Sequence, residues 1–143
     1  MGKNNITIPG EFVYETTIPV RITDINYGGH AGNDSILSLV HEARMQFLKS
    51  LNYSEMDFGG VGLIMSDLAV DFKTELMYGD ITRIRVAVSE ISKASFNLIY
   101  QLSIKREEKE IIAANVRTGM VCFDYNIRKI RAIPESALMK IKS

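Results

Sequence analysis

Residues 21–34, RITDINYGGHAGND, bring several side chains that can move protons into one short segment. Asp24 can act as a general base, and His30 has an ordinary pKa of about 6.5, which suits proton transfer near neutral pH. Asn26 lies between them and can orient a water molecule, but an amide takes up no proton at neutral pH. The segment therefore predicts acid–base chemistry carried by Asp24, Asn26 and His30.

Glycines in the same segment add a second kind of chemistry. Gly28 and Gly29 allow the backbone to approach a bound group closely. Free N–H groups at the start of a helix can hold the negative charge that develops on a carbonyl oxygen under attack. We therefore expect Gly28, Gly29 and the N–H of His30 or Ala31 to form an oxyanion site.

The periodicity of apolar residues predicts the elements that position this segment. Alternation over residues 11–24 predicts a half-buried strand, and spacing of three and four residues predicts a helix over residues 34–51, with Asn33 or Asp34 as its N-cap. Four long strands are predicted at residues 63–76, 81–91, 95–105 and 111–125, and the short turns between them imply antiparallel pairing. Pro134 suits the first turn of a short terminal helix. Because the long helix must bury its apolar stripe on one sheet face, the predicted fold class is α+β.

Composition narrows the function classes. The 143 residues, with 17 basic and 17 acidic side chains, predict one domain over residues 1–143 and no nucleic-acid partner. Cys122, the single cysteine, lies in an apolar run and is expected to be a buried thiol, and no cysteine or histidine spacing predicts a metal site. Residues 1–10 do not resemble a signal peptide, and no apolar run approaches the roughly 20 residues that span a bilayer. We expect a cytoplasmic protein without a membrane partner.

The sheet face away from the helix also needs cover. Alternation predicts that Ile99, Val116, Met120 and Phe123 do not all point toward the helix, so that part of the outer face is apolar. Zero net charge does not oppose self-association. We therefore expect a homo-oligomer, a dimer or a tetramer, that covers this face.

Three groups of residues form a wider pattern. The strand end carries Arg21, Asp24, Asn26, Gly29, His30 and Asn33, the helix carries Glu42–Ala43–Arg44, and a later turn carries Gly79–Asp80. With this pattern, nearly the whole chain resembles the hotdog-fold thioesterases of the 4-hydroxybenzoyl-CoA thioesterase type. The resemblance implies a long central helix wrapped by a curved antiparallel sheet of about five strands. It also implies an acyl-CoA substrate, a site at a subunit interface, and no cofactor apart from the coenzyme A of the substrate.

The pattern differs from the family at one position. The family's second aspartate, which looks like the nucleophile or general base, is Asn26 here. The base role then falls to His30 or to Asp24, which is expected on the same strand face as Asn26. On that interpretation an Asn26→Asp substitution lowers turnover, because the new charge repels Asp24. Glu42 lies nine residues after Asn33, about 13 Å along the helix, and is too far to serve its own helix N-terminus.

Three functions follow as alternatives. The first is hydrolysis of an acyl-CoA thioester, with Gly28, Gly29, Ala31, Asn33, Glu42 and Asp67 at the substrate. The second is a hydratase or dehydratase, in which His30 shares acid–base work with the partner subunit's Glu42. The third is an acyl-CoA-binding protein that lost turnover through Asn26.

Simpler structural roles compete with several of these assignments. Asp24 is a candidate loop anchor that accepts backbone N–H groups, and Glu42 and Arg44 are a candidate ion pair. His41 is expected to be structural. Asp67 lies in a predicted strand and is expected to face either the site or a neighbouring subunit.

Overall fold

The computed structural model describes residues 6–25, 29 and 32–142 of the chain. Within these residues the elements follow in this order: β1 (Tyr14–Pro19), the 3-10 helix η1 (Ile22–Asp24), α1 (Asn33–Ser50), β2 (Gly62–Phe72), β3 (Ile81–Ser89), β4 (Ser95–Arg106), β5 (Lys109–Asp124), β6 (Lys129–Ile130) and α2 (Glu135–Ile141). The element order is the predicted one, with η1 and the two-residue β6 as additions.

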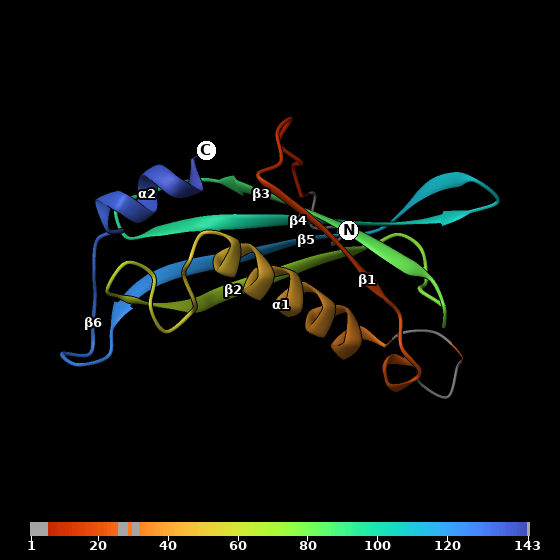
Figure 1. Cartoon of the computed structure of the whole chain (residues 1–143), viewed down its shortest axis with the longest axis horizontal. Coiled ribbons are helices and arrows are strands. Elements are labelled where there is room, and N and C mark those ends of the chain that lie inside the picture. Colours follow the sequence, from red (N-terminus) through yellow and green to blue (C-terminus); the bar gives the residue numbers. More distant parts are fainter. Residues whose placement is uncertain (1–5, 26–28, 30–31, 143) are drawn as a thin grey trace, which may run out of the picture.

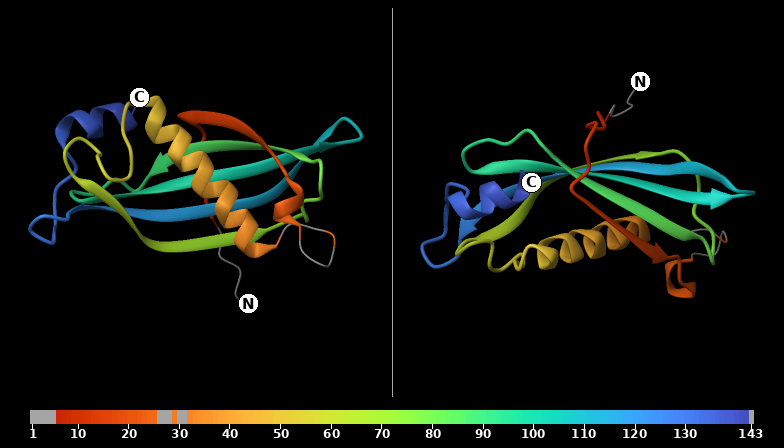
Figure 2. Two further views of the ribbon diagram at one scale, coloured as in Figure 1. Left: turned by 60° about the horizontal axis from the view of Figure 1, so that its bottom comes forward. Right: turned by 45° about the horizontal axis from the view of Figure 1, so that its top comes forward.

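The elements form two layers, with α1 lying across one face of a curved sheet (Figure 1). The strand order is β1-β3-β4-β5-β2, every pair is antiparallel, and β6 extends the end of β5. The side views in Figure 2 show the sheet curving around α1, with α2 at the end of the sheet where α1 finishes. The predicted α+β class and the wrapped central helix are confirmed.

The face of α1 toward the sheet explains why this segment is a helix. Its buried apolar residues recur at three- and four-residue spacing: Ile36, Leu39, Val40, Ala43, Phe47 and Leu48. They meet a continuous core on the sheet that includes Ile84, Val86, Leu98, Tyr100, Leu102 and Val116. Full burial of each large apolar side chain contributes about 1.5–3 kcal/mol, so this face holds α1 against the sheet.

The first strand is shorter than the alternation predicts. It ends at Pro19, and the chain then forms η1. The Asp24 carboxylate accepts the backbone N–H of Arg21 at 2.8 Å, which closes a local turn. The chain therefore does not continue as a strand to residue 24, and the prediction that Asp24 shares a strand face with Asn26 is wrong.

The start of α1 also differs from the prediction. The helix begins at Asn33 with Gly32 as its N-cap, and no side chain makes a capping hydrogen bond. The carbonyl of Gly32 accepts the N–H groups of Ser35 and Ile36, both at 3.1 Å. Asn33 and Asp34 thus lie inside the first turn, and the prediction that one of them is the N-cap is wrong.

The outer face of the sheet carries both apolar and charged side chains. Val116 and Met120 belong to the core beneath α1, whereas Ile99 and Phe123 do not. Ile99 pairs in register with Arg117. Ion pairs cross this face, with Arg83 bound to Glu15 at 2.9 Å and to Glu110 at 2.8 Å. Apolar side chains such as Ile99 therefore lie on the outer face beside these ion pairs, as the alternation predicts.

Cys122 is fully buried in the core, as predicted. Desolvation by burial raises the pKa of its thiol to about 11. The thiol is therefore protonated at neutral pH, and its place in the core is a packing role.

Candidate active site

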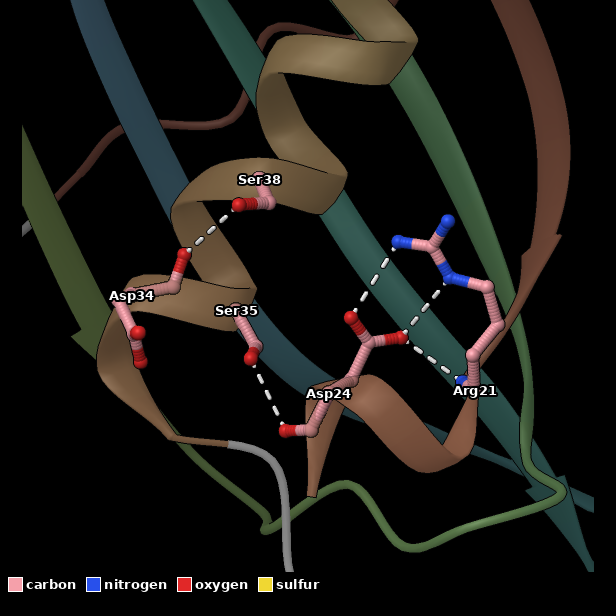
Figure 3. Close-up of polar contacts among 5 residues, drawn as sticks. All are labelled: Arg21, Asp24, Asp34, Ser35 and Ser38. Carbon is pink, nitrogen blue, oxygen red and sulfur yellow. Dashed lines mark hydrogen bonds and ion pairs between the residues drawn. The ribbon is translucent and has the colours of Figure 1, made fainter. Parts of the chain in front are cut away.

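Asp24 is held by the residue at the start of its own turn. Its Oδ2 accepts the backbone N–H of Arg21 at 2.8 Å and the Nε of the same residue at 3.3 Å, and its Oδ1 accepts Nη2 at 3.3 Å. The Asp24 side chain is only 6% exposed, whereas that of Arg21 is 60% exposed. Figure 3 shows both carboxylate oxygens directed at Arg21. This geometry favours the loop-anchor role of Asp24 over a catalytic one.

A second contact joins η1 to the first turn of α1. Ser35 donates its hydroxyl to the backbone carbonyl of Asp24 at 2.9 Å, and Ser38 donates to the carbonyl of Asp34 at 3.2 Å (Figure 3). The two ends of the chemically rich segment are therefore fixed against each other.

Most of the predicted reactive residues belong to the chain between these two elements. Asn26, Gly28, His30 and Ala31 lie outside the described residues, so their roles stay predictions. Gly29 is described and has a φ of +84°, a left-handed conformation that favours glycine. The sequence pattern thus places a glycine where the backbone needs one.

Three cavities surround the first half of α1. One of about 460 Å³ lies on the β1 side and is lined by Arg21, Ser38 and Glu42, among others. One of about 230 Å³ lies between α1 and β2, and one of about 260 Å³ lies where Asn33 meets the end of β2. The first turn of α1 thus lines the third cavity, and later turns line the other two.

Glu42 lies on the wall of the β1-side cavity. It accepts the side-chain amide of Gln46 at 2.8 Å, and Gln46 in turn accepts the hydroxyl of Thr16 at 2.5 Å. Arg44 pairs with Glu55 instead, so the predicted Glu42–Arg44 ion pair is wrong. The two side chains leave α1 on different faces, because they are two residues apart in the helix.

A buried polar network lies on the opposite side of α1. Arg44 donates Nε to Glu55 at 2.8 Å and Nη1 to the phenol oxygen of Tyr100 at 3.2 Å, and Tyr100 contacts the hydroxyl of Thr118 at 2.8 Å. His41 Nε2 lies 2.9 Å from the other oxygen of Glu55. The network runs from the exposed His41 to the fully buried Tyr100 and Thr118.

Burial and charge act together on this network. Burial acts to raise the pKa of Glu55, but the hydrogen bonds and charges of His41 and Arg44 outweigh it and lower that pKa. Burial raises the pKa of Tyr100, so its phenol keeps its proton at neutral pH. Sequence reasoning missed Glu55, Tyr100 and Thr118, and the one available signal was a charged Arg44 within the apolar stripe of a helix.

Asp67 lies on the other side of the sheet from α1. It pairs in register with Gly119, it is 57% exposed, and it accepts Nη2 of Arg117 at 3.2 Å. The structure does not bring Asp67 together with the start of α1 in this chain. Asn33, by contrast, lines the cavity at the helix start.

The fold is the hotdog fold, and the chain belongs to the thioesterase-like superfamily, whose sequence model matches residues 20–141. That match begins just before η1 and ends at the last residue of α2, so it includes the whole candidate site.

Individual relatives agree with this placement. The chain is 26% identical to a protein of Aquifex aeolicus (strain VF5) that is described as an esterase on the basis of similarity alone. The match covers 92% of this chain and 98% of the relative. The structure of a 1,4-dihydroxy-2-naphthoyl-CoA thioesterase from Synechocystis is similar at a TM-score of 0.81 and 21% identity, over 91% of this chain and 96% of that one. An Asp-to-Asn mutant of 4-hydroxybenzoyl-CoA thioesterase, complexed with 4-hydroxybenzoyl-CoA, is similar at a TM-score of 0.79 and 13% identity, over 90% and 97% of the two chains. The likeness to the two solved structures establishes the fold.

The described residues lack two further features. In residues 6–25, 29 and 32–142, no group of three or more His, Cys, Asp and Glu side chains is arranged to hold a metal ion. In the same part of the chain, no helix has the length and apolar character needed to cross a membrane.

Proposed function

We propose that the protein is an acyl-CoA thioesterase-like hydrolase that cleaves a thioester at the N-terminus of α1. The observation that carries this proposal is the tie between Asp24 and Ser35, which fixes η1 against the first turn of the helix. The first N–H groups of a helix have no partner inside it and carry partial positive charge. Superfamily membership and the CoA thioesters named for two relatives support coenzyme A as the carrier of the substrate.

The proposed reaction needs water as its only co-reactant. Water attacks the thioester carbonyl carbon, and the resulting oxyanion binds N–H groups near Gly28, Gly29 and the start of α1. His30 takes a proton from the water while Asn26 orients it. The carbon–sulfur bond then breaks, the thiol of coenzyme A leaves with a proton, and the acyl group becomes a carboxylic acid.

A panel of acyl-CoA thioesters with product analysis tests this function. We expect a free thiol and the matching carboxylic acid to appear in equal amounts. A hydrated or dehydrated acyl-CoA would instead indicate the hydratase class, in which His30 works with the partner subunit's Glu42. Tight binding of the thioesters without any product would indicate a binding protein.

Substitution of the two histidines tests where the site lies. We expect His30→Ala to lower kcat by about 100-fold or more, because a positioned acid or base contributes 10²–10⁴-fold. His41→Ala should leave kcat within about threefold. The Nε2 of His41 is hydrogen-bonded to Glu55, and His41 does not adjoin the proposed oxyanion segment. Equal losses in the two variants, with unchanged thermal unfolding, would place the site elsewhere.

We also propose a homo-oligomer, a dimer or a tetramer, with the site at a subunit interface. β2 is an edge strand of the sheet, and Met65, Leu68 and Phe72 on its α1 side are 48%, 36% and 51% exposed. Long edge strands with apolar side chains are favourable places for a second chain to pair. A cytoplasmic location without a nucleic-acid partner is part of the same proposal.

Sedimentation equilibrium tests the oligomer. We expect a mass of at least twice the 16.1 kDa of one chain at micromolar concentration. Replacing Leu68 with Lys on the edge strand should shift the distribution toward the single chain, whereas replacing the exposed Ile22, 68% exposed on η1, should not. A single-chain mass for the parent protein would rule out this part of the proposal.

A further inference from the structure

The cavity between α1 and β2 combines apolar walls with a polar floor. Leu37, Met65 and Leu68 form its apolar, partly exposed walls, and Arg44 and Thr118 lie at its floor. Its volume of about 230 Å³ exceeds the roughly 150 Å³ that accommodates a benzene molecule in an engineered cavity. A purely apolar ligand would have no use for the hydroxyl at the floor.

The direction of the hydrogen bonds at the floor can be assigned. A guanidinium only donates, so the phenol oxygen of Tyr100 accepts from Arg44. If Thr118 donated to that oxygen, the phenol proton of the buried Tyr100 would be left without an acceptor, and Tyr100 is not among the residues that line this cavity. Thr118 does line the cavity, so a ligand there can accept a threonine proton. Tyr100 therefore donates to Thr118.

This direction leaves one proton over. Within the part of the chain that the structure describes, Tyr100 is the one hydrogen-bond partner of the Thr118 hydroxyl, so the threonine proton is available to a ligand. Thr118 is covered by its cross-strand neighbour Leu68, which is 36% exposed. Met65 beside it is a flexible side chain at 48% exposure. A ligand that displaces these two side chains reaches the hydroxyl.

The position of the floor sets a length. Side chains of a helix lean toward its N-terminus, so Arg44 and its partners lie level with about residue 41 of α1. From Asn33 to His41 the helix rises by about 12 Å. An acyl chain that starts at a carbonyl near Asn33 and follows α1 covers this distance with about eight carbon atoms, a terminal oxygen and a hydrogen bond of roughly 3 Å to Thr118.

We infer that Thr118 is a specificity-determining residue that donates a hydrogen bond to an oxygen atom on the far end of a medium-length acyl group. This inference rests on the proposed function, because it assumes that the thioester carbonyl lies at the start of α1. The substrate class is a CoA thioester whose acyl group carries a hydroxyl or keto oxygen remote from the thioester.

The test compares two thioesters of equal length, 8-hydroxyoctanoyl-CoA and nonanoyl-CoA, in which a methyl group replaces the hydroxyl. The measured quantity is the ratio of their kcat/KM values. We expect Thr118→Val to lower this ratio about tenfold, because the ligand oxygen then loses its partner. Thr118→Ser keeps the hydroxyl and should change the ratio by less than about twofold.

Thr82→Val is the matched control. Thr82 is also fully buried on the α1 side of the sheet, and its hydroxyl has no hydrogen-bond partner among the described residues. It does not line the cavity between α1 and β2, so the ratio should be unchanged. If Thr118→Val does not fold, Thr118→Ala serves the same comparison. If Thr118→Val lowers kcat/KM by the same factor for both thioesters, the role of Thr118 is structural only and the inference is overturned.

A binding measurement separates this inference from the proposed function. Calorimetric titration with 8-hydroxyoctanoate and nonanoate requires no turnover. A ratio of dissociation constants that shifts toward nonanoate in Thr118→Val, in a protein that hydrolyses neither thioester, would support the inference and reject hydrolysis. An unshifted ratio, in a protein that hydrolyses both, would reject the inference and leave hydrolysis standing.

Discussion

Arg44→Met is expected to lower the free energy of unfolding by about 3 kcal/mol, because removing one partner of a buried ion pair leaves the other without compensation. Arg44 is 6% exposed and holds both Glu55 and the buried Tyr100. Methionine retains much of the length of the side chain but supplies no donor. Urea unfolding of parent and variant, with unchanged slope, measures the difference.

Arg117→Met is the matched control. Its ion pair with Asp67 lies on the exposed outer face, with side chains 34% and 57% exposed. Such pairs contribute from zero to about 1 kcal/mol. A loss in Arg44→Met no greater than that in Arg117→Met would show that the buried network does not stabilise the fold.

The dependence of this effect on pH has a definite sign. The pKa of Glu55 is lowered in the folded protein from its usual 4.5. Its ion pair therefore stabilises the fold at pH values above about 4.5, and this contribution is lost as the pH falls through the lowered pKa. The difference in free energy of unfolding between the parent and Arg44→Met should accordingly become smaller below pH 4.5. A larger difference there would contradict the role of Glu55 as the ion-pair partner of Arg44.

Asn26→Asp is expected to raise turnover tenfold or more, toward the 10²–10⁴-fold that a positioned general base supplies. Sequence alone favours the opposite result, since it offers Asp24 as a free replacement base. In the structure both oxygens of Asp24 accept hydrogen bonds from Arg21, and the guanidinium also compensates its charge. A new carboxylate at position 26 therefore meets less repulsion and fills a role that Asp24 does not perform.

Steady-state kinetics on one short and one long acyl-CoA measure this gain. Asn97→Asp on β4 makes the same chemical change away from α1 and should leave turnover unchanged. A fall in turnover of Asn26→Asp on both substrates would contradict this prediction and would show that the added charge disturbs the proton transfer at His30.

The sequence by itself determined the order and type of the elements. Apolar residues recur every second position in the strands and every third or fourth position in α1, because only one face of each element must be buried. This spacing predicted the helix that contains Ile36 to Phe47 and the four long strands. The hotdog fold and the thioesterase-like superfamily were indicated by a resemblance to a known family, which short motifs such as Glu42–Ala43–Arg44 carry. The buried state of Cys122 followed from its apolar neighbours.

Tertiary structure decided where the polar groups go. Arg44 reaches Glu55 across 11 residues and Tyr100 across 56, and strand register alone brings Tyr100 to Thr118. The same register turned Val116 and Met120 inward and Asp67 outward. A hydrogen bond depends on distances of a few tenths of an ångström between groups far apart in the chain, whereas burial patterns depend only on local spacing. For this reason the polar floor beneath α1 emerged only from the folded chain.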